Sequence, residues 1–81
     1  MSVRLPMINM ELTGQRITEL RLANGMTVRD LQAIFGFATP QAIYKWQRGV
    51  TMPTIDNLIV LCAIWDTQVE DILVIENDGI G

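Results

Sequence analysis

Histidine is absent from this 81-residue sequence, and cysteine occurs only once, as Cys62. Structural zinc sites need several cysteine or histidine ligands, so we expect no metal site of this kind. The nucleophile–base pairs of common hydrolases and a glycine-rich phosphate loop are also missing. A single cysteine excludes an internal disulfide and fits a reducing cytoplasm. We therefore expect a cytoplasmic protein that is not an enzyme and that needs no metal or cofactor.

Long apolar runs are missing as well. The longest, Leu58 to Trp65, falls well short of the roughly 20 residues that span a bilayer. The N-terminal residues contain no continuous apolar core of a signal peptide, so we expect neither a secretory leader nor a membrane partner. Hydrophobic residues still make up 49% of the chain. A chain of this length and composition predicts one small domain.

Positive charge is missing from the second part of the chain. Residues 1–48 hold all six basic residues and three acidic ones, about +3, whereas residues 49–81 hold six acidic residues and no basic one, about −6. The net charge of −3 argues against a nucleic-acid ligand, but binding depends on the local field at the contact face. The asymmetry is also consistent with an ordinary solvated surface.

Helical periodicity and capping signals dominate what is present. Thr27 and Asp30 form a capping-box variant, Gly36 is a stop signal, and Thr39-Pro40 is a strong helix start. A further capping box begins at Thr67. The predicted helices cover about residues 14–23, 27–35, 39–48, 55–65 and 67–73.

The two ends of the chain carry weaker signals. Residues 1–12 contain Pro6 and no clear period, which predicts an extended arm, and residues 75–81 are predicted as a loose tail. No hairpin signal lies between the helices. The sequence thus predicts an all-α fold, with the five helices in residues 13–74.

The helix predicted over residues 39–48 has two different faces. A rotation of about 100° per residue places the polar side chains on one arc and Ile43 and Trp46 on the opposite side. We predict Trp46 in the core. Glutamine, lysine and arginine can bond adenine, guanine and phosphate, so the polar face can enter a major groove, although most surface helices also have a polar face. The polar arc consists of Gln41, Tyr44, Lys45 and Arg48.

The order of the helices adds specificity to this interpretation. Two short capped helices, 27–35 and 39–48, are joined by a turn that contains Gly36. One helix precedes them and two follow. This is the layout of a helix-turn-helix at about residues 27–48, whose second helix reads DNA.

The segments RITELRLANGMTVRDLQAIFG, TPQAIYKWQRG and MPTIDNLIVLCAIWDTQVEDIL resemble the Cro/phage-repressor-like, or xenobiotic-response-element, family of helix-turn-helix regulators. The resemblance implies a compact five-helix, lambda-repressor-like domain that binds double-stranded DNA and regulates transcription, most often as a repressor. It also implies base-reading residues and phosphate contacts. The base-reading positions are Gln41, Tyr44 and Lys45, and the phosphate contacts are Arg29, Thr39, Arg48 and Thr51.

Three positions and one spacing depart from the pattern of this family. Val28 replaces a phosphate-binding glutamine, and Gln32 stands where a small residue is usual. The connection from Gly36 to Trp46 is one residue longer. Gln47 replaces a glutamate that commonly pairs with the arginine at Arg21, which predicts a hydrogen bond between a charged and a neutral group.

The fourth predicted helix is apolar around most of its circumference. This pattern is typical of a buried helix in a small core, and it is also typical of a self-association surface. We expect a homodimer, because the operators of such readers mirror a twofold axis. The predicted interface comprises Ile59, Val60, Ala63 and Trp65. An alternative function is a protein-interaction module, such as the antitoxin of a toxin–antitoxin pair.

Overall fold

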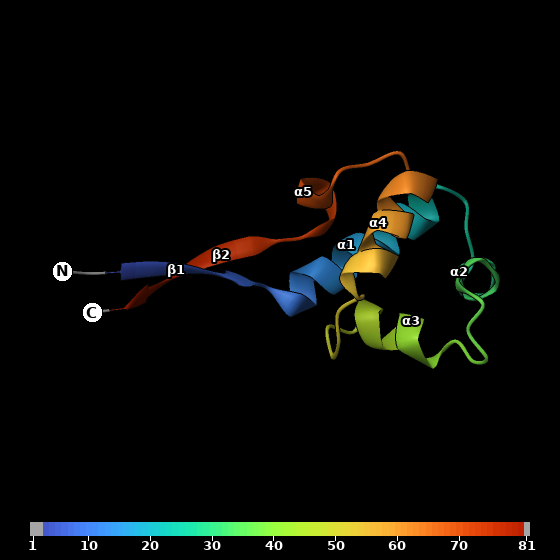
Figure 1. Cartoon of the computed structure of the whole chain (residues 1–81), viewed down its shortest axis with the longest axis horizontal. Coiled ribbons are helices and arrows are strands. Elements are labelled where there is room, and N and C mark those ends of the chain that lie inside the picture. Colours follow the sequence, from blue (N-terminus) through green and yellow to red (C-terminus); the bar gives the residue numbers. More distant parts are fainter. Residues whose placement is uncertain (1–2, 81) are drawn as a thin grey trace.

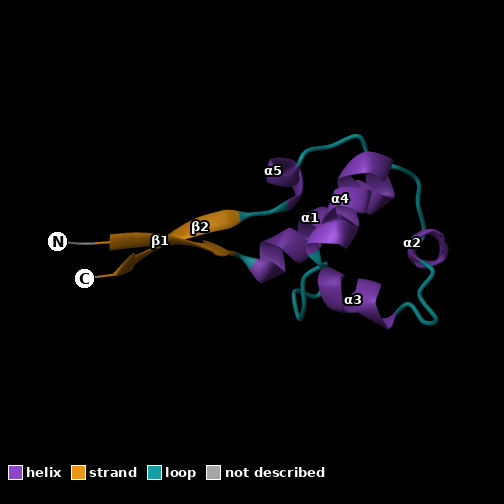
Figure 2. Ribbon diagram, in the orientation of Figure 1, coloured by secondary structure: helices purple, strands orange, loops and turns teal. Residues whose placement is uncertain are grey.

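The computed structural model describes residues 3–80, which form five helices flanked by two short strands (Figures 1 and 2). The helices gather into one body, and the two strands project from it as a ribbon that carries both chain ends. The molecule measures 49 × 23 × 20 Å. No helix within residues 3–80 is long and apolar enough to cross a membrane. In chain order the elements are β1 (Val3–Ile8), α1 (Met10–Ala23), α2 (Val28–Phe35), α3 (Gln41–Gln47), α4 (Ile55–Ile64), α5 (Val69–Ile72) and β2 (Ile75–Ile80).

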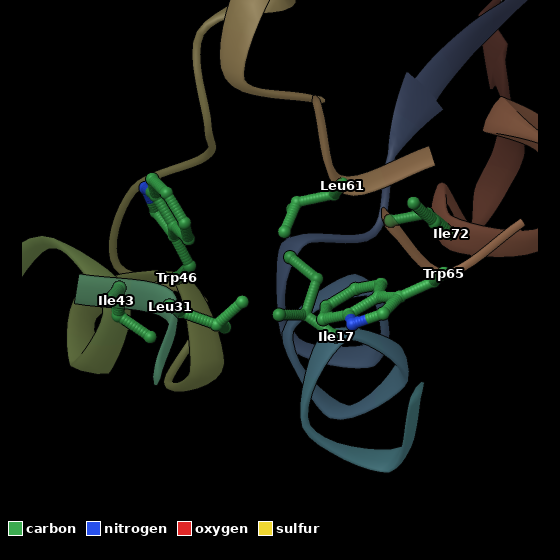
Figure 3. Close-up of a cluster of buried hydrophobic side chains, with 7 residues drawn as sticks. All are labelled: Ile17, Leu31, Ile43, Trp46, Leu61, Trp65 and Ile72. Carbon is green, nitrogen blue, oxygen red and sulfur yellow. The ribbon is translucent and has the colours of Figure 1, made fainter. Parts of the chain in front are cut away.

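Every helix contributes a side chain to one hydrophobic core (Figure 3). Trp46 is only 3% exposed, which confirms its prediction as a core residue. Trp65 was expected on a self-association surface, and this placement is wrong: its ring is 5% exposed, and its indole N–H points at the sulfur of Met26 at 3.4 Å. Trp65 is the C-cap residue of α4 and precedes Asp66, whose φ is +47°. The core consists of Ile17, Leu31, Ile43, Trp46, Leu61, Trp65 and Ile72.

Side-chain caps fix where the helices begin. In α2 the predicted capping box is confirmed: the amide of Asp30 donates to the Thr27 hydroxyl at 3.0 Å, and the amide of Thr27 donates to the Asp30 carboxylate at 2.8 Å. The start of α1 differs, because Asn9 accepts from the amide of Leu12 and the helix begins at Met10, within the predicted arm. The capping box of α5 lies one residue later than predicted. The amide of Gln68 donates to the Asp71 carboxylate at 3.2 Å, whereas the predicted box began at Thr67.

The predicted loose tail is wrong, because residues 75–80 form β2. This strand pairs antiparallel with β1, with Ile8 opposite Ile75 and Pro6 opposite Asn77. The two strands come from opposite ends of the chain, so no turn signal in the sequence connects them. Polar contacts at the base of the ribbon hold it to the helices: Asn9 N–H donates to the Val74 carbonyl at 2.8 Å, and Val74 N–H donates to the buried Thr13 hydroxyl at 2.9 Å.

Candidate nucleic-acid interface

The turn between α2 and α3 begins with a left-handed residue. Gly36 has φ of +67°, a conformation that glycine adopts at little cost. The Gly36 amide donates to the carbonyl of Ala33, and the Phe37 amide donates to the carbonyl of Gln32. The side chain of Gln32 in turn donates to the carbonyl of Phe37 at 3.2 Å. Gln32, which stands where the family usually has a small residue, therefore stabilises this turn through its carbonyl and its side chain.

Aromatic packing accommodates the longer connection between the two helices. The ring of Phe37 stacks on Phe35 with centroids 5.2 Å apart and meets Trp46 edge-to-face at 5.8 Å. Phe35 also meets Trp46 edge-to-face, at 5.5 Å. Such geometries add attraction beyond the buried area. The turn is consequently anchored to the core side of α3.

The two faces of α3 are separated as the sequence predicts. Ile43 is fully buried and Trp46 nearly so, while Gln41, Tyr44 and Lys45 are exposed. Tyr44 exposes 42% of its surface. The helix is shorter than predicted, because it begins at Gln41, after Thr39-Pro40, and ends at Gln47. Its three candidate base-reading side chains all lie on the part that is helical.

The inner side of α3 lies very close to α1. A Cβ atom added to Gly14 would collide with the carbonyl oxygen of Trp46 and would lie 2.6 Å from that of Gln47. Backbone contact at this point leaves no space for any side chain. The predicted contact across the same interface is confirmed, because Arg21 Nε donates to Gln47 Oε1 at 2.9 Å. Residues on α1 thus fix the position of the candidate reading helix.

The candidate phosphate-binding side chains are also at the surface. Arg29, Thr39, Arg48 and Thr51 are all exposed. After α3 the chain folds back on itself, and the amides of Val50 and Thr51 donate to the carbonyl of Lys45 at 2.9 and 3.4 Å. These two amides already have a partner, so the exposed Thr51 hydroxyl remains the candidate phosphate contact at this residue.

An open hollow of about 720 Å³ lies between α2 and α3. Its lining includes Arg29 and Tyr44, one from each helix, so two of the predicted DNA contacts share this surface. No signal in the sequence marked this hollow, because it arises from the spacing of the two helices. The remaining lining residues are Val28, Gln32, Ala33, Gly36, Phe37 and Pro40.

The predicted self-association residues on α4 lie on more than one side of the helix. Ile59 is 57% exposed and Ala63 is exposed, whereas Val60 is half-buried. Ile55, one turn before Ile59, is 78% exposed and was not included in the predicted interface. Residues four apart lie on one helix face, so Ile55, Ile59 and Ala63 form an apolar stripe, here called the α4 stripe.

The single cysteine, Cys62, is a half-buried free thiol on α4. Burial raises the pKa of the Cys62 thiol, and the negative charges of Glu70 and Asp71 raise it further. Such a thiol is protonated and poorly nucleophilic at neutral pH. Among the residues that the structure describes, no group of three histidine, cysteine or acidic side chains is arranged to hold a metal ion.

Comparisons with known proteins agree with this arrangement. No curated protein matches the sequence. The crystal structure of the DNA-binding domain of BldD superposes with a TM-score of 0.67 at 17% identity, over 80% of this chain and 93% of that one. At this identity the likeness shows the fold alone. A family model described as the Cro/C1-type helix-turn-helix DNA-binding domain matches residues 16–78. The chain therefore belongs to the Cro/C1-type helix-turn-helix family of DNA-binding domains.

Proposed function

We propose that the chain is a transcriptional repressor that places α3 in the major groove of double-stranded DNA. The observation that carries this proposal is the division of α3 into a buried apolar face and an exposed face with Gln41, Tyr44 and Lys45. Long polar side chains on a rigid helix can reach base edges, and a helix of this diameter fits the major groove. Repression follows from occupancy, because a bound domain blocks access to the same stretch of DNA.

Arg29 and Arg48 supply the electrostatic part of binding. They are exposed and lie on α2 and just after α3, on either side of the base-reading residues. Each phosphate that a cation neutralises contributes about −0.9 to the slope of log affinity against log salt. Two such cations per protomer, Arg29 and Arg48, predict a slope of roughly −2 for each half-site. The affinity of one protomer is accordingly modest.

Selection of bound sequences from a random DNA pool, followed by a salt titration, tests the proposal. We expect one enriched motif and an affinity that falls steeply with salt. A pool without enrichment would argue against base reading. Binding that does not depend on salt, or no binding at all, would contradict the proposal as a whole.

The α4 stripe favours a second candidate function, a protein-interaction module of the antitoxin type. Exposed apolar side chains in a row are typical of protein contact sites. Ile55 and Ile59 are both more than half exposed. An interaction module without DNA binding would show no salt-dependent DNA affinity, so the same titration separates the two candidates.

A further inference from the structure

We propose that the hollow between α2 and α3 binds the 5-methyl group of a pyrimidine base, and that Pro40 determines this preference. The inference rests on the proposed function, in which α3 lies in the major groove, and it names a base group that the groove presents to this hollow. It depends on the chemistry of the lining, on the position of Pro40 beside the base-reading residues and on the few apolar groups that DNA displays.

The hollow receives apolar side chains from α2, from α3 and from the turn between them. Val28 is the first residue of α2, and Pro40 immediately precedes the first residue of α3. Val28, Phe37 and Pro40 are half-buried, so each of them still presents part of its surface. Their side chains can neither donate nor accept a hydrogen bond. An apolar group that displaces water from these side chains is therefore favoured.

The turn from α2 to α3 lies at the end of the molecule opposite the ribbon, and several of its polar groups are bonded to one another (Figure 1). The Phe37 amide donates to the carbonyl of Gln32 at 3.1 Å, and the Gln32 side chain donates back to the Phe37 carbonyl at 3.2 Å. The Pro40 carbonyl accepts from the amide of Tyr44 at 3.2 Å. Pro40 itself has no N–H. The exposed polar side chains of the lining are those of Arg29 and Tyr44.

Pro40 lies directly beside the side chains that are proposed to read bases. Gln41, the next residue, is exposed at the start of α3. Tyr44 follows Pro40 by four residues, a spacing that places two side chains on one face of a helix, and both residues line the hollow. In the proposed complex, a base edge within reach of Gln41 or Tyr44 therefore lies close to the ring of Pro40.

The major groove displays one kind of apolar group at the edges of its bases. This group is the 5-methyl of thymine, whereas the other groups that distinguish the bases there are hydrogen-bond donors and acceptors. An apolar surface beside the base-reading side chains is thus complementary to a thymine. A cytosine that carries the same methyl group fits equally well. The two bases share this methyl group, and chemically modified DNA distinguishes them.

Arg29 and the size of the hollow suit the same occupant. Arg29 lines the hollow from α2, and its guanidinium can pair with a phosphate of the strand that carries the methylated base. The hollow, at about 720 Å³, is much larger than one methyl group. The sugar and phosphate beside the base would occupy the rest of it. The arginine thus positions the strand, while the apolar side chains distinguish a methylated pyrimidine from an unmethylated one.

Binding to modified DNA tests the inference. Once the preferred site has been selected, each thymine of one half-site is replaced in turn by uracil, which removes only the methyl group. We expect one of these replacements to weaken binding about 4-fold, equivalent to ~0.8 kcal/mol for one buried methyl or methylene group. At the same position, 5-methylcytosine should bind about 4-fold tighter than cytosine. Tighter binding of 5-methylcytosine than of thymine would identify methylated cytosine as the source of the group.

Variants of the lining connect the methyl group to the hollow. Pro40→Ala removes most of the proline ring, so its preference for thymine over uracil should fall below about 2-fold. The matched Pro53→Ala variant removes a proline from the segment before α4 and should keep the preference of the parent. Val28→Thr keeps the shape of the side chain but adds a hydroxyl group, and it should also reduce the preference. Thermal unfolding shows whether each variant is folded, and an undiminished preference in folded Pro40→Ala and Val28→Thr overturns the inference.

A failure of the inference is distinguishable from a failure of the proposed function. An enriched motif whose thymines all tolerate uracil would overturn methyl recognition and leave base reading by α3 intact. A chain without salt-dependent affinity for DNA would overturn both. Loss of the uracil effect in Gln41→Ala, with the effect retained in Pro40→Ala, would assign the methyl contact to Gln41 and overturn the role of the hollow.

Discussion

Arg21 on α1 and Gln47 at the end of α3 are joined by a hydrogen bond of 2.9 Å between Nε and Oε1. The same guanidinium donates to the carbonyl of Met26, also at 2.9 Å. One side chain thus connects α1, the loop before α2 and the inner side of α3. The acceptor on α3 is neutral, so this contact lacks the charge assistance of an ion pair.

Replacing Gln47 by glutamate should stabilise the domain. The carboxylate would turn the contact with Arg21 into a half-buried ion pair, and we expect a gain of up to ~1 kcal/mol in the free energy of unfolding at low salt. The gain should shrink as salt is added, because screening weakens the pair. Gln47→Ala should instead cost ~1–3 kcal/mol, since it leaves a guanidinium N–H without its acceptor. Urea unfolding of both variants at two salt concentrations checks this, and a salt-independent gain would speak against the ion pair.

Gln41→Ala and Lys45→Ala should each weaken binding to the selected DNA site by ~1–3 kcal/mol and relax its sequence preference. The reason is that each side chain is exposed on α3 and free to contact a base edge. Arg48→Ala is the control, because loss of a phosphate contact weakens binding to all sequences alike. Affinities measured on the selected site and on scrambled DNA distinguish the two effects. A uniform loss for Gln41→Ala would remove it from base reading.

Trp46→Ala should lower the free energy of unfolding by ~3–5 kcal/mol, because it leaves a cavity in the core. This is a large part of the stability of a small domain. The ring is 3% exposed and touches Phe35 and Phe37. Tyr44→Ala, two residues earlier and on the exposed face of α3, should change the free energy of unfolding little. Thermal unfolding of the two variants provides the comparison, and a Trp46→Ala protein that melts like the parent would show that this ring is not a core element.

The Asp30 carboxylate should stabilise α2 in a pH-dependent way. The backbone N–H of Thr27, and next its hydroxyl, lower the pKa of Asp30 below its ordinary value of 3.8. A carboxyl with a lowered pKa in the folded state stabilises that state above its unfolded pKa, and this stabilisation is lost as pH falls through the folded pKa. Asp30→Asn should therefore be less stable than the parent at neutral pH and indistinguishable from it in strong acid.

Unfolding measured from pH 7 down to about pH 2 covers this window. Glu19→Gln is the control, since it removes a carboxylate from the exposed side of α1, where no cap depends on it. A constant difference between Asp30→Asn and the parent across the whole range would contradict the role of the ionised carboxylate.

Most of the helical domain could be predicted from the sequence because its signals are local. The capping box at Thr27 and Asp30 and the stop at Gly36 each involve residues within one turn of one another. The division of α3 into two faces follows from helical periodicity alone. The exact start of α3 could not be predicted from these signals. The sequence suggested Thr39 as the N-cap, but Pro40 occupies that position and the Gln41 amide donates to the Thr39 hydroxyl at 3.4 Å.

The features that the sequence did not reveal depend on distant residues. β1 and β2 pair although they lie at opposite ends of the sequence, and a proline such as the one in β1 usually argues against a strand. Trp65 was predicted at the surface because α4 is apolar around most of its circumference, whereas its burial depends on distant residues such as Met26, whose sulfur faces the indole N–H. The close contact of α1 with α3 at Gly14 is likewise tertiary, and one glycine in a sequence does not predict which element it contacts.

The exposed face of α3 contributes little to what holds the domain together. Its inner side is fixed by Gly14, Arg21 and the aromatic cluster, whereas Gln41 and Lys45 point to solvent. Changes at the outward positions should leave the free energy of folding almost untouched. In the proposed base-reading role of α3, new operator preferences would then arise by single substitutions without a compensating change elsewhere, and a designer can vary these positions in a library while the scaffold stays constant.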